Sequence, residues 1–164
     1  MEASLRWLSR RLGLVTVTVC LTGTATVLVG FMTVEASSEH VIRSEALPQG
    51  VSAHSLRGNP LFVVRTGDEV TVFSGRSTHL GQRLMWCPQD RIFVEPMAGS
   101  FYDERGRVVP GSPAFRGMFT YESRWEDGDL LIDLATAEYG PSQHEDPGRP
   151  PLLYPDNFSD CVRS

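Results

Sequence analysis

The sequence has no lysine, and its 15 basic residues, all arginine, are outnumbered by 20 aspartate and glutamate residues. Three arginines, Arg6, Arg10 and Arg11, fall within the first 11 residues beside Glu2. The rest of the chain therefore holds 12 arginines against 19 acidic residues, a balance of −7. Because binding to phosphates needs clustered positive charge, this acidic body argues against a nucleic-acid partner.

Cysteine is scarce, with three residues at positions 20, 87 and 161. Val19 precedes Cys20, a poor match to a lipoprotein cleavage site, so no lipid-modified cysteine is expected. No serine, histidine and aspartate group forms a recognisable nucleophile motif. His144 lies beside Glu145 and Asp146 in a proline-rich tail, and we interpret it as solvated rather than as a metal ligand. The sequence predicts a protein that is not an enzyme.

Charge is absent from residues 12–34, which read LGLVTVTVCLTGTATVLVGFMTV. As a helix with a rise of about 1.5 Å per residue, this segment spans roughly 34 Å, enough for the core of a bilayer. We predict an uncleaved transmembrane helix; the alternative is a cleaved signal peptide, for which TVEASS is a weak cleavage site. The arginines before it place residues 1–11 in the cytoplasm and the body in the periplasm. The stretch SRRLGL resembles a twin-arginine export signal, unless its arginines only set topology.

One face of this predicted helix is made of small residues. Thr16, Gly23 and Gly30 recur every seven positions, and Thr26 and Thr33 fall on nearly the same face. Small residues let another helix approach closely, and close packing drives helix association in lipid. The segment is therefore predicted to dock into a larger membrane complex.

Short β-rich runs separated by turns dominate the chain beyond residue 54. Leu61–Arg65 and Val70–Phe73 flank the turn TGDE, and further hairpins are predicted at residues 104–106 and at Asp127-Gly128. This pattern predicts the all-β class, with one small antiparallel β-domain at residues 55–136 and no helix outside the membrane.

The two segments that flank this domain lack a sustained apolar period. Residues 35–54 are predicted to be a linker. Residues 137–164 are rich in proline and are predicted to be an irregular arm. Because the stretch PPLLYPDNF is apolar, docking of this arm on the domain is favoured over disorder.

Two stretches, STHLGQ at 77–82 and EPMAGSFYD at 95–103, resemble the paired cluster-binding motifs of Rieske iron–sulfur proteins, C-T-H-L-G-C and C-P-C-H-G-S-x-F/Y-D. The flanking strands resemble the family as well, from about residue 55 to residue 134. The resemblance implies a Rieske-like β-domain, and many Rieske subunits carry one N-terminal membrane helix. The residues shared with the two motifs are Thr78, His79, Leu80, Gly81, Pro96, Gly99, Ser100, Tyr102 and Asp103.

The resemblance fails at the ligands. The four positions that hold the cluster in the family correspond to Ser77, His79, Glu95 and Ala98, so only the histidine at 79 remains. The two cysteines that brace the cluster loops in the family correspond to Gln82 and Met97.

The chemistry of these substitutions predicts that no cluster is bound. Iron–sulfur clusters need soft thiolate, whereas Ser77 is a hard alcohol and Ala98 has no donor atom. A zinc ion held by Ser77, His79 and Glu95 would lack a third strong ligand, so no metal or other cofactor is expected. Met97 and Ala98 are apolar and are expected to fill the former cluster cavity.

Cys87 and Cys161 are the two cysteines beyond the predicted membrane helix. In an oxidising compartment an even pair favours a disulfide, which would pin the C-terminal arm to the domain. The alternative is that Cys87 is an unpaired buried thiol, and the sequence leaves both open.

Together these features predict a non-catalytic, single-pass subunit of a bacterial electron-transfer complex, either a photosynthetic reaction centre or a cytochrome bc-type complex. Its expected partners are transmembrane and periplasmic subunits and a soluble cytochrome c, which an acidic body would attract. Two alternatives are an electron-transfer protein with atypical ligation and a free membrane-anchored binding module.

Overall fold

A computed structural model describes residues 39–43, 45, 47–151 and 158–164. The described residues belong to one compact unit, Ala36–Ser164. The predicted membrane helix, with its face of small residues, lies outside the described residues. Within the described part of the chain, no helix has the length and hydropathy needed to cross a bilayer.

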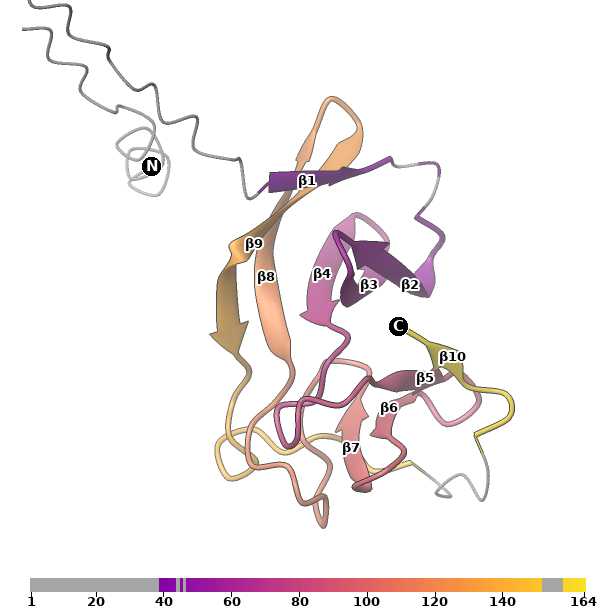
Figure 1. Ribbon diagram of the computed structural model, residues 1–164, viewed down its shortest axis with the longest axis vertical. Coiled ribbons are helices and arrows are strands. Elements are labelled where there is room, and N and C mark those ends of the chain that lie inside the picture. The colour runs from indigo at the N-terminus through magenta and orange to yellow at the C-terminus, as the bar shows by residue number, and fades with distance from the viewer. Residues whose placement is uncertain (1–38, 44, 46, 152–157) are drawn as a thin grey trace, which may run out of the picture. The chain divides into compact units, whose positions relative to one another are not determined.

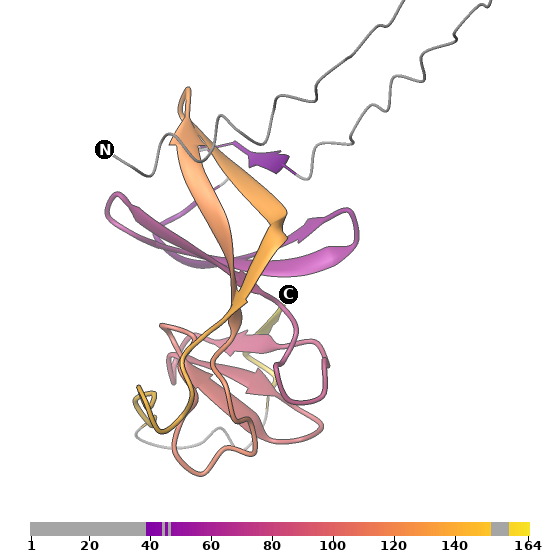
Figure 2. The same ribbon diagram turned by 90° about the vertical axis from the view of Figure 1, so that its left-hand side faces the viewer.

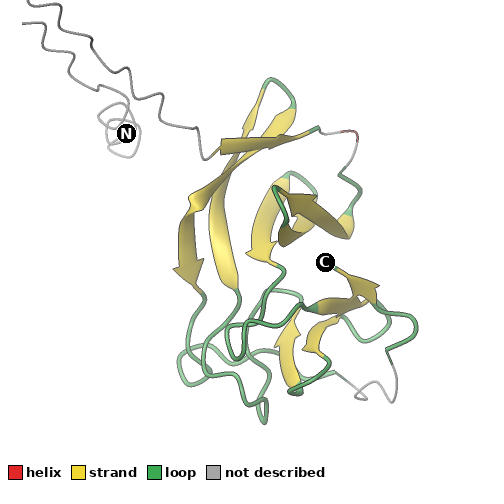
Figure 3. Ribbon diagram, viewed as in Figure 1, coloured by secondary structure: helices red, strands yellow, loops and turns green. Residues whose placement is uncertain are grey.

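The described chain is built almost entirely of strands and loops (Figure 3). A six-stranded sheet has the order β1-β9-β8-β4-β3-β2, and a four-stranded sheet has the order β10-β5-β6-β7 (Figure 1). All neighbouring strands pair antiparallel, which confirms the predicted all-β class. The strands are β1 (Glu39–Ile42), β2 (Gly50–Leu56), β3 (Asn59–Thr66), β4 (Glu69–Ser74), β5 (Met85–Cys87), β6 (Ile92–Glu95), β7 (Ser100–Asp103), β8 (Phe119–Glu126), β9 (Asp129–Tyr139) and β10 (Val162–Arg163).

Two of the predicted hairpins are confirmed. β3 and β4 pair through the turn at Gly67-Asp68, and β8 and β9 pair through Asp127-Gly128. Both Asp127 and Gly128 have positive φ angles, of 52° and 87°, as a two-residue hairpin turn requires. At residues 104–106 the chain does reverse, but β7 meets the returning segment only at a single bridge, between Tyr102 and Val108.

The prediction that residues 35–54 form a linker is wrong. β1 and most of β2 lie in this range, and they form the two edges of the six-stranded sheet. β1 pairs with β9, and Ile42 and Leu47 are buried in the core beneath that sheet. β1 is only four residues long and β2 has small and polar residues between its apolar ones, so neither produces a sustained periodic signal.

An aromatic cluster joins the two sheets. Phe62 and Phe73 of the larger sheet pack with Trp86, Phe93 and Tyr102 of the smaller one. Phe93 is central, because its ring centroid lies 4.9 Å from that of Phe62 and 4.7 Å from that of Trp86. Figure 2 shows the sheets one above the other. This packing stabilises the strands β4 to β7, whose connecting loops carry the candidate site.

The C-terminal arm contacts the domain along its described residues. The backbone N–H of Gly140 donates to Met118 (3.1 Å), and that of Gly148 donates to Val108 (2.7 Å). The arm is less irregular than predicted, because β9 continues to Tyr139 and β10 pairs with β5. Contact with the domain favours the docked alternative for these residues, whereas Leu152, Leu153 and Tyr154 lie outside the described residues.

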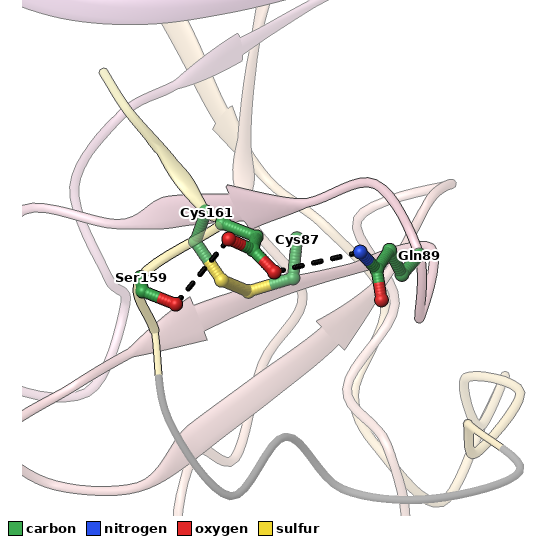
Figure 4. Close-up of a disulfide and its surroundings, with 5 residues drawn as sticks. Cys87, Gln89, Ser159 and Cys161 are labelled. Carbon is green, nitrogen blue, oxygen red and sulfur yellow. Dashed lines mark hydrogen bonds between the residues drawn. A yellow bond between two sulfur atoms is a disulfide. The ribbon is translucent and has the colours of Figure 1, made fainter.

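Of the two alternatives for Cys87, the structure has the disulfide. Cys87 at the end of β5 is bonded to Cys161 just before β10, across a separation of 74 residues (Figure 4). Ile92, Val94 and Phe158 pack in the same small cluster. The bond therefore fixes the chain terminus to the sheet that carries the candidate site.

Candidate functional site

Two neighbouring loops form the candidate site. The first loop, Ser77–Gln82, connects β4 to β5, and the second loop, Pro96–Gly99, connects β6 to β7. Each is closed by its own backbone: the N–H of Ser77 donates to Gln82, that of Gly81 donates to Ser77, and that of Gly99 donates to Glu95. Gly81 and Gly99 have φ angles of +68° and +69°, a conformation that favours glycine. The loops therefore keep their shape through protein hydrogen bonds.

A buried side-chain network links the starts of the two loops. The Oγ of Ser77 donates to Oε2 of Glu95 at 2.8 Å and lies 2.9 Å from the hydroxyl of Tyr102. The backbone N–H of His79 donates to the same Oγ at 3.0 Å. Ser77, Glu95 and Tyr102 are all buried. The serine thus joins β6, β7 and the first loop at one atom.

A third segment closes this network. Thr78 donates its hydroxyl proton to the carbonyl of Arg116 at 2.6 Å, and its backbone N–H donates to the Tyr102 hydroxyl at 3.2 Å. Because Ser77 donates to Glu95, its oxygen is free to accept the phenolic proton of Tyr102. The hydroxyls therefore form an ordered chain that ends at the carboxylate.

His79 lies at the exposed rim of this network. Its Nδ1 is 3.2 Å from Oγ of Ser100 and 3.6 Å from Oε2 of Glu95. The second distance is too long for a hydrogen bond. The side chain of His79 is 31% exposed, whereas that of Glu95 is fully buried. The pair thus places an accessible imidazole beside an inaccessible carboxylate.

Glu95 is incompletely satisfied. Its Oε1 is the one buried side-chain oxygen or nitrogen among the described residues that has no hydrogen-bond partner. Leaving a buried polar atom without a partner is costly, and for an ionised carboxylate the cost is larger.

No family model matches the chain, but several curated proteins are similar to it in sequence. It is 32% identical over 100 residues to the cytochrome b6-f complex iron–sulfur subunit 2 of Synechocystis, a match covering 59% of this chain and 55% of the relative. It is 33% identical over 83 residues to the cytochrome b6-f complex iron–sulfur subunit of Trichodesmium erythraeum, covering 49% and 46%. These similarities support a relationship to the Rieske iron–sulfur proteins. The chain's matches span about half the length of these curated relatives.

Solved Rieske structures are also similar. The plasma membrane Rieske protein PetC3 from Synechocystis has 25% identity and a TM-score of 0.43, over 51% of this chain and 85% of the other. A chain of a hyperthermophilic respiratory complex III has 25% identity and a TM-score of 0.45, over 79% of this chain and 89% of the other.

The structure brings together three of the four predicted Rieske ligand positions, Ser77, His79 and Glu95. Ala98 lies half-buried in the second loop and has no donor atom. Gln82 is exposed, and Met97 is 85% exposed. The expectation that Met97 fills the former cavity is therefore wrong: its side chain points to solvent because the hydroxyl and carboxylate network fills the interior between the loops.

Tyr102 and Arg116 are the site residues that sequence reasoning missed. Tyr102 belongs to the second Rieske motif, so its place in the pattern was available as a signal. The carbonyl of Arg116 carries none, because a backbone acceptor from a distant segment leaves no trace in residue type. No group of three or more histidine, cysteine, aspartate or glutamate side chains that could hold a metal occurs in the described part of the chain.

Proposed function

We propose that this chain is a non-catalytic, membrane-anchored accessory subunit of an electron-transfer complex. Its Rieske-like domain holds no iron–sulfur cluster and acts at the periplasmic face by bracing neighbouring subunits or docking an electron carrier. The observation that carries this proposal is the buried network of Ser77, Glu95 and Tyr102, which occupies the loop interior where Rieske ligands are expected.

The donor set of the two loops does not fit a two-iron cluster. Neither loop contains cysteine, and the two cysteines of the described chain, Cys87 and Cys161, are joined to each other. His79 offers one imidazole, and Glu95 offers a hard carboxylate whose Oε2 already accepts a hydrogen bond from Ser77. Rieske centres use two thiolates and two imidazoles. Without a cluster the domain has no redox couple of its own.

The loops have other means of staying folded. Backbone hydrogen bonds close each loop, and the Ser77 hydroxyl connects them. Gln82 and Met97 stand where the family has a bracing disulfide, and in this chain a different disulfide, Cys87–Cys161, holds the end of β5, the strand that follows the first loop. A scaffold stabilised in this way presents a fixed surface and needs no cofactor to do so.

Membership of a complex is supported by the kind of relatives found and by the N-terminal segment. The curated relatives are named as subunits of cytochrome b6-f complexes. Residues 12–34 are predicted from the sequence to be the anchor, and the small residues predicted to share one face of it suit contact with another helix. The excess of acidic residues suits a basic electron carrier such as a cytochrome c, because opposite charge accelerates encounter.

Native purification from source membranes tests this proposal. In gentle detergent, the chain is expected to co-purify with cytochrome or pigment-binding subunits, and the isolated polypeptide is expected to lack iron, labile sulfide and visible absorbance. Stoichiometric iron and sulfide, with a rhombic EPR signal on reduction, would instead establish atypical ligation. A chain that purifies alone would be a free binding module.

A further inference from the structure

The two sheets have four edges, and three of them are protected against pairing with a further strand. β1 is only four residues long and carries Glu39, and β10 has two residues, one of which is Arg163. β7 is covered by residues 107–112, since the N–H of Val109 donates to the carbonyl of Phe101 at 3.0 Å. Short strands, charged side chains and covering segments are the usual means by which proteins keep an edge from pairing with a neighbour.

The fourth edge, β2, has none of these features (Figure 1). Its sequence, GVSAHSL, contains no proline, aspartate, glutamate or arginine, and all of its 7 residues pair with β3 without a bulge. No residue of β2 is fully buried, so the strand is accessible along its length. Within the described part of the chain, no strand lies on its outer side. β2 is therefore open to pairing.

The β2–β3 hairpin shows which backbone groups of β2 point outward. Its two-residue turn is Arg57-Gly58, with positive φ at both residues, and Leu56 is the strand residue just before it. In such a hairpin the pair that closes the turn is hydrogen-bonded, and hydrogen-bonded and non-hydrogen-bonded pairs then alternate along the strands. The backbone N–H and C=O groups that point away from β3 are therefore those of Val51, Ala53 and Ser55.

We propose that β2 pairs with β2 of a second copy of this chain, antiparallel and centred on Ala53. In this register Ala53 lies opposite its own equivalent and Val51 lies opposite Ser55, so each of these pairs exchanges both backbone hydrogen bonds. Main-chain bonding to an exposed sheet edge is a recurrent basis of protein association. Because β2 contains no acidic residue and no arginine, pairing with itself brings no like charges face to face. The inference goes beyond the proposed function and does not depend on it.

The charges at the two ends of β2 favour a second copy as the partner. Arg57 is exposed at one end. At the other end, Gln49 is hydrogen-bonded to the β3–β4 turn (3.2 and 2.9 Å), where Asp68 and Glu69 are exposed. The basic residue near this end, Arg65, donates to two backbone carbonyls. Antiparallel pairing brings Arg57 of each copy beside the acidic end of the other, so opposite charges meet at both ends of the interface.

The mass of the purified full chain in detergent tests the pairing. Sedimentation equilibrium, corrected for bound detergent, is expected to show a concentration-dependent dimer. Ser55→Lys places a charge on the edge and should lower the association constant about tenfold or more. Ala53→Pro should do the same, because it removes an outward N–H that the hairpin does not use. The matched control is Val41→Lys, which adds a charge at an exposed side chain of the opposite edge and should leave the mass unchanged.

Disulfide cross-linking tests the register. In a chain that also carries Cys20→Ser, Ala53→Cys should link two copies on oxidation, because the Cα atoms of a hydrogen-bonded antiparallel pair lie about 5.5 Å apart. Ser55→Cys is the matched control in the same strand. It should not link, because in this register the two equivalent Cα atoms are roughly 14 Å apart, too far for a disulfide.

Three results would overturn the inference: a monomer at every concentration, a dimer that persists in Ser55→Lys, or equal cross-linking through cysteines at positions 53 and 55. A dimer held by the predicted membrane helix would give the second of these. If Ala53→Cys in source membranes links to a different polypeptide, β2 pairs with a partner subunit and the second copy is refuted. A monomeric chain that co-purifies with cytochrome refutes this inference alone, whereas iron and labile sulfide refute the proposed function.

Discussion

Two buried carboxylates lie at the ends of two neighbouring strands, and they accept very different numbers of hydrogen bonds. Asp103, at the end of β7, is 3% exposed and accepts hydrogen bonds from the backbone N–H groups of Arg105, Arg107 and Arg149. The guanidinium of Arg107 adds two more, at 2.9 and 2.7 Å. Glu95, at the end of β6, accepts one from Ser77 and has an oxygen without a partner.

The two carboxylates therefore differ in how much each contributes to holding the fold together. The side-chain hydrogen bond to Asp103 raises the pKa of Arg107, so the guanidinium remains charged beside it. Arg107 also binds Asp146 at 2.9 Å, and with the bond from Arg149 this ties the C-terminal arm to β7. Every lone pair used at Asp103 stabilises the fold, whereas Oε1 of Glu95 makes no hydrogen bond within the described part of the chain.

Restoring the Rieske ligands in the two loops is expected to have the largest effect. The variant carrying Ser77→Cys, Glu95→Cys and Ala98→His should acquire one two-iron cluster per chain on reconstitution, seen as visible absorbance and a rhombic EPR signal, because His79 supplies the fourth ligand. The control without Ala98→His should lack that spectrum. A folded triple variant that binds no iron would show that these are not vacated ligand positions.

Removing the disulfide should be the next largest change. Replacing both Cys87 and Cys161 with serine opens a loop of 74 residues, so the free energy of unfolding should fall by about 4 kcal/mol, measured by urea denaturation. Cys20→Ser serves as the control and should leave the midpoint unchanged. If the double variant unfolded at the same urea concentration as the wild type, the Asp103 network alone would be enough to hold the arm on the domain.

Asp103→Ala tests the satisfied carboxylate. It leaves five donors without an acceptor and Arg107 without its main partner, so unfolding free energy should drop by about 3 kcal/mol. Asp146→Ala removes only the outer, half-exposed partner of Arg107 and should cost no more than about 1 kcal/mol. Equal losses in the two variants would contradict a central role for Asp103.

Glu95→Gln tests the unsatisfied carboxylate and should change stability by less than about 1 kcal/mol. The amide keeps an acceptor for Ser77 and removes a buried charge that the described residues do not fully pair. A loss as large as that of Asp103→Ala, measured by the same urea titration, would mean that the charge of Glu95 is itself structural.

The smallest expected effect is a pH dependence away from both carboxylates. Burial lowers the pKa of His54, whose Nε2 lies 2.8 Å from Oγ of Ser52. The unfolded chain therefore binds the proton more readily, and stability falls as pH drops below about 6.5. Because His54 is only half-buried, His54→Gln should reduce this loss of unfolding free energy by about 0.5 kcal/mol or less. An unchanged slope would assign the effect to another group.

The sequence predicted the hairpins at Gly67-Asp68 and Asp127-Gly128 because turn residues and alternating apolar residues act locally. It missed β1, whose pairing partner β9 lies far along the chain, and β2, which pairs with the neighbouring β3 but has few apolar residues. At the site, the motifs predicted which residues share the two loops, and the structure shows Ser77, His79 and Glu95 together. Met97 was misjudged because an apolar side chain at a loop tip can face either way.

By itself, the sequence determined the all-β class, the pair of Rieske-like loops and the absence of cysteine from both, since these depend on residue type and local order. The tertiary structure decided the rest: that Cys87 meets Cys161, that Tyr102 and Ser77 lead a chain of hydroxyls to Glu95, and that one carboxylate is satisfied while the other is not. Hydrogen-bond partners come from segments distant in sequence, and only packing of the two sheets brings them within 3 Å.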